Sequence, residues 1–144
     1  VYRYDPDSGV TQQMTTDFYM PNGLAFSPDE TLLYVIDTGS THFDDGPNHI
    51  RRFQVGKDGS LTGGDVFARN EALCFDGLRT DCTGRLWCSA EDGVHCYSQD
   101  GKLIGKILTP KRAGNLCFGE VDRKTMFICA TNSTFRCRLS TPGI

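Results

Sequence analysis

The sequence predicts an all-β fold of the β-propeller type, and three observations support this prediction. Short apolar runs alternate with tight turns, and the 144 residues include 16 glycines and 6 prolines. No segment keeps the spacing of an amphipathic helix over three turns. One short motif recurs three times, and the runs around it group into units of four strands, which is how propeller blades follow one another along a chain.

The recurring motif is a short corner of glycine and polar residues that leads into an apolar strand. Its copies are Pro21–Phe26, Phe75–Thr80 and Ala113–Phe118. The copies align on their leucines, which are Leu24, Leu78 and Leu116. In this alignment one position is occupied by Asn22, Asp76 and Gly114. The uneven spacing of the copies indicates one structural unit that is repeated with an insertion.

Residues 1–16 are expected to form a hairpin ahead of the first copy. Val1–Tyr4 alternates apolar and polar side chains, and Val10–Thr16 has the pattern of a second strand. Between them, Asp5–Gly9 has the composition of a tight turn. These two strands correspond to the outer strands of a blade.

Residues 21–68 and 75–108 each have the pattern of a complete blade. In the first, the expected strands are Leu24–Phe26, Leu32–Asp37, Ile50–Val55 and Asp65–Ala68. The polar segment Thr38–Asn48 is expected to be a loop and supplies the insertion. In the second blade, the expected strands are Phe75–Thr80, Arg85–Ala90, Gly93–Tyr97 and Leu103–Leu108.

Residues 113–139 have only three expected strands, which are Asn115–Phe118, Met126–Ala130 and Thr134–Leu139. Two complete blades and two partial ones cannot close a ring, because blade faces and strand edges would stay unpaired. We therefore expect the chain to be the C-terminal half of one larger propeller domain. Residues 1–16 would be outer strands of one blade, residues 113–139 would be inner strands of the closing blade, and an N-terminal half would be the structural partner.

Composition and charge exclude two classes of partner. The formal net charge is −3, and no basic cluster exceeds two adjacent residues, so the sequence lacks the footprint of a nucleic-acid-binding protein. No apolar run approaches the length that spans a membrane, so no membrane partner is expected. A cytoplasmic location is expected, with a secreted or periplasmic one as the alternative.

The chain contains seven cysteines, so at least one is unpaired. Cys88 and Cys96 flank one expected hairpin turn, and Cys129 and Cys137 flank another at the same spacing. Two cross-strand disulfides are one interpretation of this pattern. We favour the other, in which the four are reduced small side chains at equivalent positions on neighbouring strands, because no spacing resembles a compact secreted disulfide scaffold.

Several motifs together resemble the gluconolactonase family, which includes regucalcin and luciferin-regenerating enzyme. The resemblance begins in Pro21–Asp29, Leu33–Gly39 and Asp76–Asp81. It continues through Asp92–Tyr97 and Gly114–Gly119, so it covers nearly the whole chain. Each motif alone is weak because Asn-Gly and Asp-Gly turns are common, and the order and spacing of the motifs carry the match.

The resemblance implies a six-bladed propeller with one divalent metal ion in its central channel. In that family an early Glu, the Asn of the Asn-Gly-Leu motif and the Asp of the Asp-Gly motif hold the metal. The matching motifs assign the last two to Asn22 and Asp76 and place the Glu outside this chain. Oxygen ligands of this kind suit Ca²⁺, the expected metal, and also Mg²⁺, Mn²⁺ or Zn²⁺. Spacing alone favours turn residues that cap strand starts, whereas the resemblance favours ligation.

The resemblance also implies a metal-dependent hydrolase that opens an aldono-lactone ring. The metal would polarise the lactone carbonyl. Asp76 is the one matched residue that can also take a proton from the attacking water, although metal binding lowers the basicity of a carboxylate. A non-enzymatic propeller that binds calcium or another protein is the alternative, because propellers have many functions.

Three residues around the long loop are weaker candidates. Asp37 could lie behind the metal ligands, but we favour a role as acceptor in a turn. His42 and His49 flank the loop, which could overhang the channel mouth, where loops often carry function. For both histidines we favour a solvated position.

The later strands contain four further residues whose side chains could bear on function. Asn115 lies one position after the aligned ligands, which favours substrate contact over metal binding. His95 is expected on the surface of a third strand, and Trp87 in the core between blades. Ser89 lacks the motif of a catalytic nucleophile.

Overall fold

The computed structural model describes residues 1–70 and 74–144, and in them it contains thirteen β-strands and no α-helix. The first two sheets comprise β1 (Tyr2–Tyr4) and β2 (Thr11–Gln13), and then β3 (Pro21–Phe26), β4 (Leu32–Asp37), β5 (His49–Val55) and β6 (Leu61–Arg69). The third comprises β7 (Phe75–Thr80), β8 (Leu86–Ala90), β9 (Gly93–Tyr97) and β10 (Leu103–Leu108). The fourth comprises β11 (Ala113–Gly119), β12 (Thr125–Ala130) and β13 (Ser133–Arg138). The all-β prediction is confirmed.

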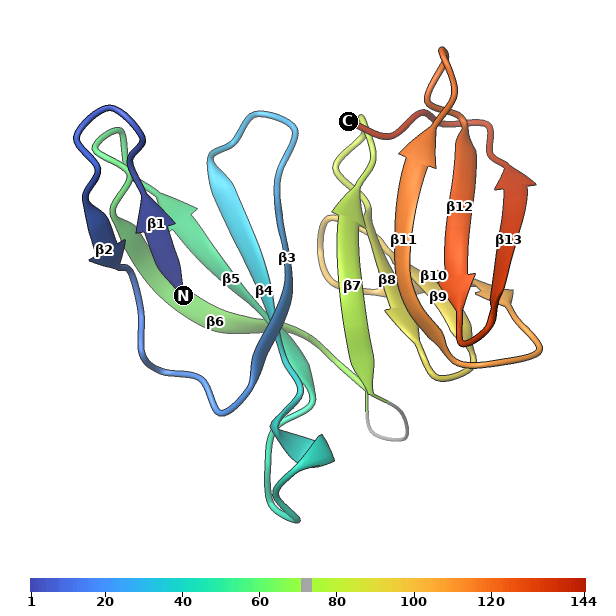
Figure 1. Ribbon diagram of the computed structural model, residues 1–144, viewed down its shortest axis with the longest axis horizontal. Helices are drawn as coiled ribbons and strands as arrows, with labels where there is room; N and C mark the ends of the chain where they lie inside the picture. The colour runs from blue at the N-terminus through green and yellow to red at the C-terminus, as the bar shows by residue number, and fades with distance from the viewer. Residues whose placement is uncertain (71–73) are drawn as a thin grey trace.

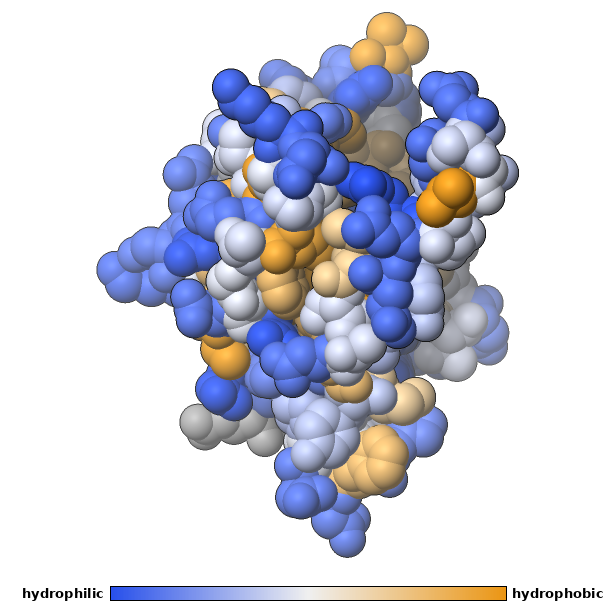
Figure 2. Space-filling view, turned by 90° about the vertical axis from the view of Figure 1, so that its left-hand side faces the viewer, coloured by the Kyte–Doolittle hydropathy of each residue, from blue (hydrophilic) through white to orange (hydrophobic). Residues whose placement is uncertain are grey.

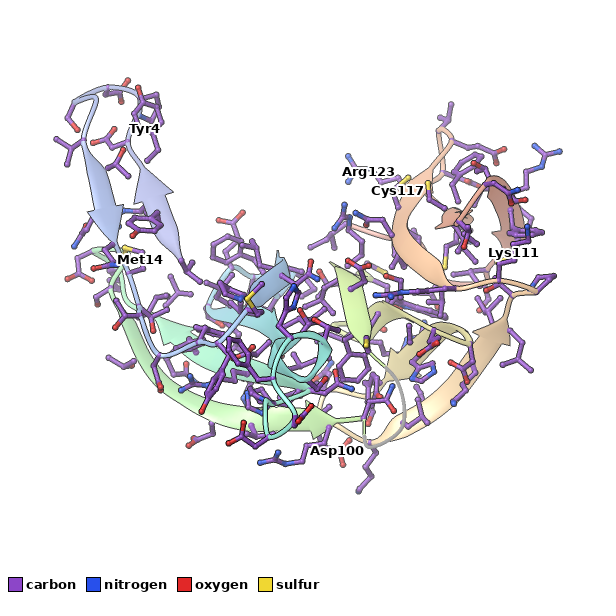
Figure 3. All side chains as sticks on the ribbon, turned by 60° about the horizontal axis from the view of Figure 1, so that its bottom comes forward. Tyr4, Met14, Asp100, Lys111, Cys117 and Arg123 are labelled. Atoms are coloured by element: carbon purple, nitrogen blue, oxygen red, sulfur yellow. The ribbon has the colours of Figure 1, made fainter. Side chains whose placement is uncertain are left out.

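The four sheets follow one another in chain order (Figure 1) and lie along an arc (Figure 3). Every strand pairs antiparallel with the next one in its sheet. The first strand of each longer sheet lies on the concave side, where β7 contacts β3 on one side and β11 on the other. A 3-10 turn, Gly39–Thr41, lies in the loop between β4 and β5. No helix among the described residues is long and apolar enough to cross a membrane.

Three apolar cores alternate with the sheets. Val35 and Phe53 face the first hairpin, and Val1 packs against them. Between the second and third sheets the core contains Phe75, while Met126 lies in the core between the third and fourth. The second and third sheets therefore each bury both faces against two neighbours, as expected for tandem blades.

The cysteine pairs lie on neighbouring strands, as predicted, but they are not direct cross-strand partners. The partner of Cys88 is His95, and the partner of Cys129 is Thr134. Because side chains alternate across a strand, Cys88 and Cys96 face different cores. All seven cysteines are free. The hairpin turns are centred slightly away from the midpoint between the cysteines, so the two cysteines of each pair are displaced along the strands.

Large apolar side chains are exposed in two places. Tyr2, Tyr4 and Val10 are exposed in the first hairpin, and Leu24 and Phe26 are exposed on β3. Figure 2 shows hydrophobic surface among polar side chains on one side of the molecule. Exposed apolar surface of this kind marks an interaction site or a liability for aggregation.

We expect the 144 residues expressed alone to aggregate or to lack a cooperative melt, because blade faces need neighbours. Size-exclusion chromatography and thermal melting would test this. A sharp monomer peak together with a cooperative transition would contradict the expectation.

Candidate active site around Asn22 and Asp76

A β-bulge interrupts each of the three inner strands at its start. The register shifts lie between Pro21 and Leu24, between Phe75 and Leu78, and between Ala113 and Asn115. A bulge leaves a residue out of the ladder and redirects its side chain. Asn22 and Asp76 lie within the first two bulges, so the local structure releases both from regular pairing.

Glycines let these bulged strands approach one another closely. A Cβ atom on Gly23 would lie 2.4 Å from the carbonyl oxygen of Asp76. A Cβ atom on Gly77 would lie 2.4 Å from Oδ1 of Asn115. The backbone next to Asn22 therefore touches the backbone of Asp76, and the two predicted ligands lie at the same level of adjacent strands.

Replacing Gly23 with Ala should destabilise the full-length protein by about 1–3 kcal/mol, because the added methyl group meets backbone that cannot move aside easily. Chemical denaturation would measure the change. Gly105→Ala is the matched control, since a Cβ atom on Gly105 meets nothing within 4 Å. Equal stabilities of the two variants would show that the close approach is not required.

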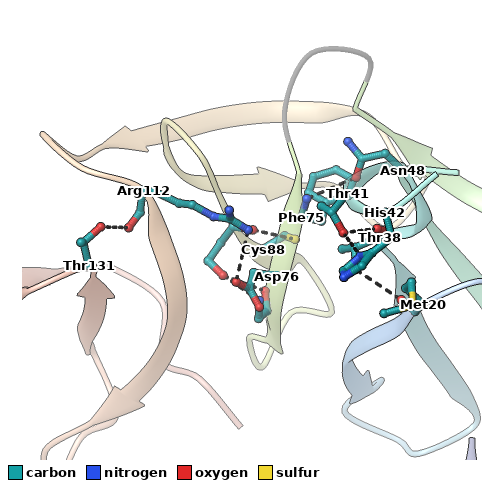
Figure 4. A network of polar contacts seen from close by, with 12 residues as sticks. Met20, Thr38, Thr41, His42, Asn48, Phe75, Asp76, Cys88, Arg112 and Thr131 are labelled. Carbon is teal, nitrogen blue, oxygen red and sulfur yellow. Dashed lines mark hydrogen bonds and ion pairs between the residues drawn. The ribbon is translucent and has the colours of Figure 1, made fainter. Parts of the chain in front are cut away.

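The side chain of Asp76 has few protein partners. Nη2 of Arg112 lies 3.8 Å from Oδ2 of Asp76, and the side chain of Asp76 is 30% exposed. Figure 4 shows Arg112 reaching over Asp76, with Cys88 beside it. In the described residues, no hydrogen bond is donated to either carboxylate oxygen of Asp76 or to the side chain of Asn22. Both side chains therefore keep oxygen atoms free for a ligand.

Asp37 shows the opposite arrangement and has a structural role. Its carboxylate accepts hydrogen bonds from the backbone N–H groups of Tyr19, Met20 and Gly39, at 2.9, 2.9 and 3.0 Å. These bonds fix the segment that enters β3 just before Asn22. The interpretation of Asp37 as a turn acceptor is confirmed.

A hollow of about 470 Å³ lies beside Asn22. Its lining consists of Met20, Pro21, Asn22, Thr38, Thr41, His42 and Arg112. Arg112 also lines the next hollow, together with Gly114 and Asn115. One guanidinium group thus connects the surroundings of Asn22 with those of Asp76. Sequence analysis missed Arg112, although its position two residues before Gly114 in the third repeat could have indicated that it lies near Asn22 and Asp76.

The available oxygen atoms fit a hard divalent cation. Asn22 offers an amide oxygen and Asp76 a carboxylate, which are the ligand types that Ca²⁺ and Mg²⁺ prefer. Within residues 1–70 and 74–144, no three His, Cys, Asp or Glu side chains form a metal-binding group.

The other candidates occupy structural positions. Asn115 turns its Oδ1 back to the N–H of Leu116, at 2.8 Å. Trp87 is buried in the core between blades, as predicted. Ser89 is buried, and its hydroxyl group accepts a hydrogen bond from the N–H of Gly77 at 2.7 Å, which supports the bulge at that residue.

The two remaining histidines lie away from the hollow beside Asn22. His95 is only 2% exposed, so the expectation of a surface position is wrong. The ring of Phe75 packs against the imidazole ring of His95, and Nε2 of His95 lies 2.6 Å from Oδ1 of Asp92. His49 lines a separate hollow of about 820 Å³ on the other side of the loop, and burial lowers its pKa.

Residues 1–132 match the family described as SMP-30/gluconolactonase/LRE-like region. The chain belongs to this family. A gluconolactonase from Zymomonas mobilis is 32% identical over 99% of this chain and 41% of its own length. A 6-deoxy-6-sulfogluconolactonase from Pseudomonas putida is 33% identical over 83% of this chain and 41% of its own length.

A solved structure of a gluconolactonase from Xanthomonas campestris has the same fold, with a TM-score of 0.83 and 35% identity. The match covers 99% of this chain and 44% of that protein. The family's fold confirms the predicted propeller class. This chain spans less than half the length of the relatives named here.

Proposed function

We propose that this family member, within a full-length propeller, is a metal-dependent lactonase that opens aldono-lactone rings. The observation that carries the proposal is that Asn22 and Asp76, two side chains with oxygen atoms, lie in the bulges of neighbouring strands beside a hollow. Relatives above 30% identity that are named as lactonases support the reaction class.

Asn22 and Asp76 would hold the metal, with Ca²⁺ as the expected ion and Mg²⁺, Mn²⁺ or Zn²⁺ as alternatives. When bound, the metal would act as a Lewis acid toward the lactone carbonyl. Asp76 would also take a proton from the attacking water and return one to the ring oxygen that leaves. Arg112 would orient the substrate by donating hydrogen bonds from its guanidinium group. The ring of a sugar lactone would lie in the hollow beside Asn22.

Removing the metal should abolish hydrolysis of D-glucono-1,5-lactone by the full-length protein, and adding Ca²⁺ back should restore it. The measurement is the rate of acid release before and after treatment with a chelator. Activity that persists after complete removal of metal would contradict the metal requirement. Metal binding without hydrolysis of any aldono-lactone would favour a non-enzymatic calcium-binding propeller.

A further inference from the structure

The loop between β4 and β5 is fixed beside Asn22 by its own contacts. The N–H of Ser40 donates to the carbonyl of Pro47 at 2.9 Å, and the N–H of His42 donates to the carbonyl of Gly39 at 3.0 Å. The rings of Phe43 and Tyr19 pack edge to face, with centroids 5.6 Å apart. The position of His42 in the lining of the hollow is therefore defined by the fold of the loop.

A chain of two hydrogen bonds selects the tautomer of the neutral imidazole ring of His42. Oγ1 of Thr41 donates its only proton to the carbonyl oxygen of Thr38, at 2.8 Å. The same Oγ1 lies 2.7 Å from Nδ1 of His42 (Figure 4). A hydroxyl group has one proton, and that of Thr41 is already donated to Thr38. Oγ1 must therefore accept the hydrogen bond that Nδ1–H of His42 donates. A hydrogen bond at one ring nitrogen selects the tautomer, so the neutral ring carries its free lone pair on Nε2.

This lone pair gives the lining of the hollow a hydrogen-bond acceptor on the imidazole ring of His42. Arg112 can only donate hydrogen bonds. In the proposed function, the amide oxygen of Asn22 is a metal ligand. Within the described residues, Nε2 of His42 has no hydrogen-bond partner. A hydroxyl group on a bound ring would need such an acceptor, because a polar group buried without a partner weakens binding.

We propose that Nε2 of His42 accepts a hydrogen bond from a substrate hydroxyl group and thereby selects polyhydroxylated rings. This inference rests on the proposed function for the identity of the site, and Thr41 is the positioning residue that holds the tautomer. His42 therefore acts in substrate recognition, while proton transfer belongs to Asp76.

Nitrogen-15 NMR of the full-length protein tests the tautomer without any need for turnover. The signals of His42, assigned by their loss in His42→Ala, should show protonated Nδ1 and unprotonated Nε2 in the neutral ring. Thr41→Val should shift the ring toward the opposite tautomer, and Thr41→Ser should restore the wild-type signals. A ring protonated at Nε2 in the wild-type protein would overturn the proposal.

Titration with 1,5-anhydroglucitol, a hydroxylated ring without a lactone carbonyl, tests recognition independently of hydrolysis. We expect His42→Ala to weaken its binding about tenfold, the loss of one hydrogen bond, and Thr41→Val to weaken it less. Asp45→Asn is the control, because Asp45 lies in the same loop but lines the other hollow. Unchanged binding in His42→Ala would overturn the proposal, whatever the outcome for lactone hydrolysis.

Kinetics with D-glucono-1,5-lactone separate recognition from chemistry. In His42→Ala, KM should rise about tenfold while kcat changes little. A loss of kcat of about a hundredfold with unchanged KM would instead place His42 in proton transfer and overturn its role in recognition. If the wild-type protein hydrolyses no lactone, the proposed function fails while the NMR and polyol measurements still decide the role of His42.

Discussion

Replacing Asp81 with Asn should destabilise the full-length protein by about 3 kcal/mol, since it breaks a buried network at a charged centre. Asp81 follows β7 and is fully buried. Its Oδ2 accepts hydrogen bonds from Nε1 of Trp87 at 2.9 Å and from Nε of Arg85 at 2.7 Å. Its Oδ1 accepts bonds from the backbone N–H and the hydroxyl group of Thr83. An amide keeps the shape but turns one acceptor into a donor that faces other donors.

The destabilisation should also depend on pH. Burial alone would raise the pKa of Asp81, but hydrogen bonds from Trp87, Thr83 and Arg85 outweigh it, and the net pKa lies below its ordinary value. A lowered pKa means that the carboxylate stabilises the fold above the pKa of the unfolded chain, and that this contribution is lost as the pH falls through the folded pKa. The difference between wild type and Asp81→Asn should therefore be full at pH 7 and shrink in acid.

Urea denaturation of both proteins from pH 7 down to pH 3 would measure this. Asp29→Asn is the matched control, because Asp29 occupies the corresponding turn of the preceding blade and receives similar hydrogen bonds from Ser27 and Thr31, but is exposed. Its replacement should change stability far less. A similar loss in both variants would show that burial of Asp81 is not the source of the effect.

The repeat made most of the fold predictable. Aligned leucines and Gly-containing corners placed the inner strands, and the observed β4, β7, β9 and β10 have the expected bounds. Local turn chemistry and apolar alternation are sufficient for such hairpins, because each strand pairs with its neighbour in the chain. The register of the cysteine pairs was less predictable, because the spacing of two cysteines does not fix where a turn is centred. A displacement of one residue moves two side chains to opposite faces.

The surroundings of the site were less predictable because they depend on contacts between distant segments. Arg112 and Asp76 lie 36 positions apart in the chain and come together only through the packing of β11 on β7. The position of His42 follows from the internal hydrogen bonds of an irregular loop, which has no periodic signal in the sequence. The repeat alignment did bring Asn22 and Asp76 to one level of adjacent strands, because it compares equivalent positions in successive blades.

Replacing Asp76 with Asn should reduce lactone hydrolysis by the full-length protein about a hundredfold or more, even at saturating metal. The variant keeps the shape of the side chain and one ligand oxygen but loses the negative charge, so metal affinity should fall and the proton acceptor should disappear. Asn22→Ala is the comparison: it removes a ligand but leaves the carboxylate, so excess metal should restore part of its rate.

Rates and metal affinities of both variants, measured across a titration with Ca²⁺, separate the two roles of Asp76. Rescue of Asn22→Ala but not of Asp76→Asn would assign both metal binding and proton transfer to Asp76. Recovery of Asp76→Asn to nearly the wild-type rate at high metal would make Asp76 a ligand alone. Wild-type affinity and rate in both variants would remove Asn22 and Asp76 from the site, because two neighbouring oxygen ligands cannot be lost without effect from a centre that they hold.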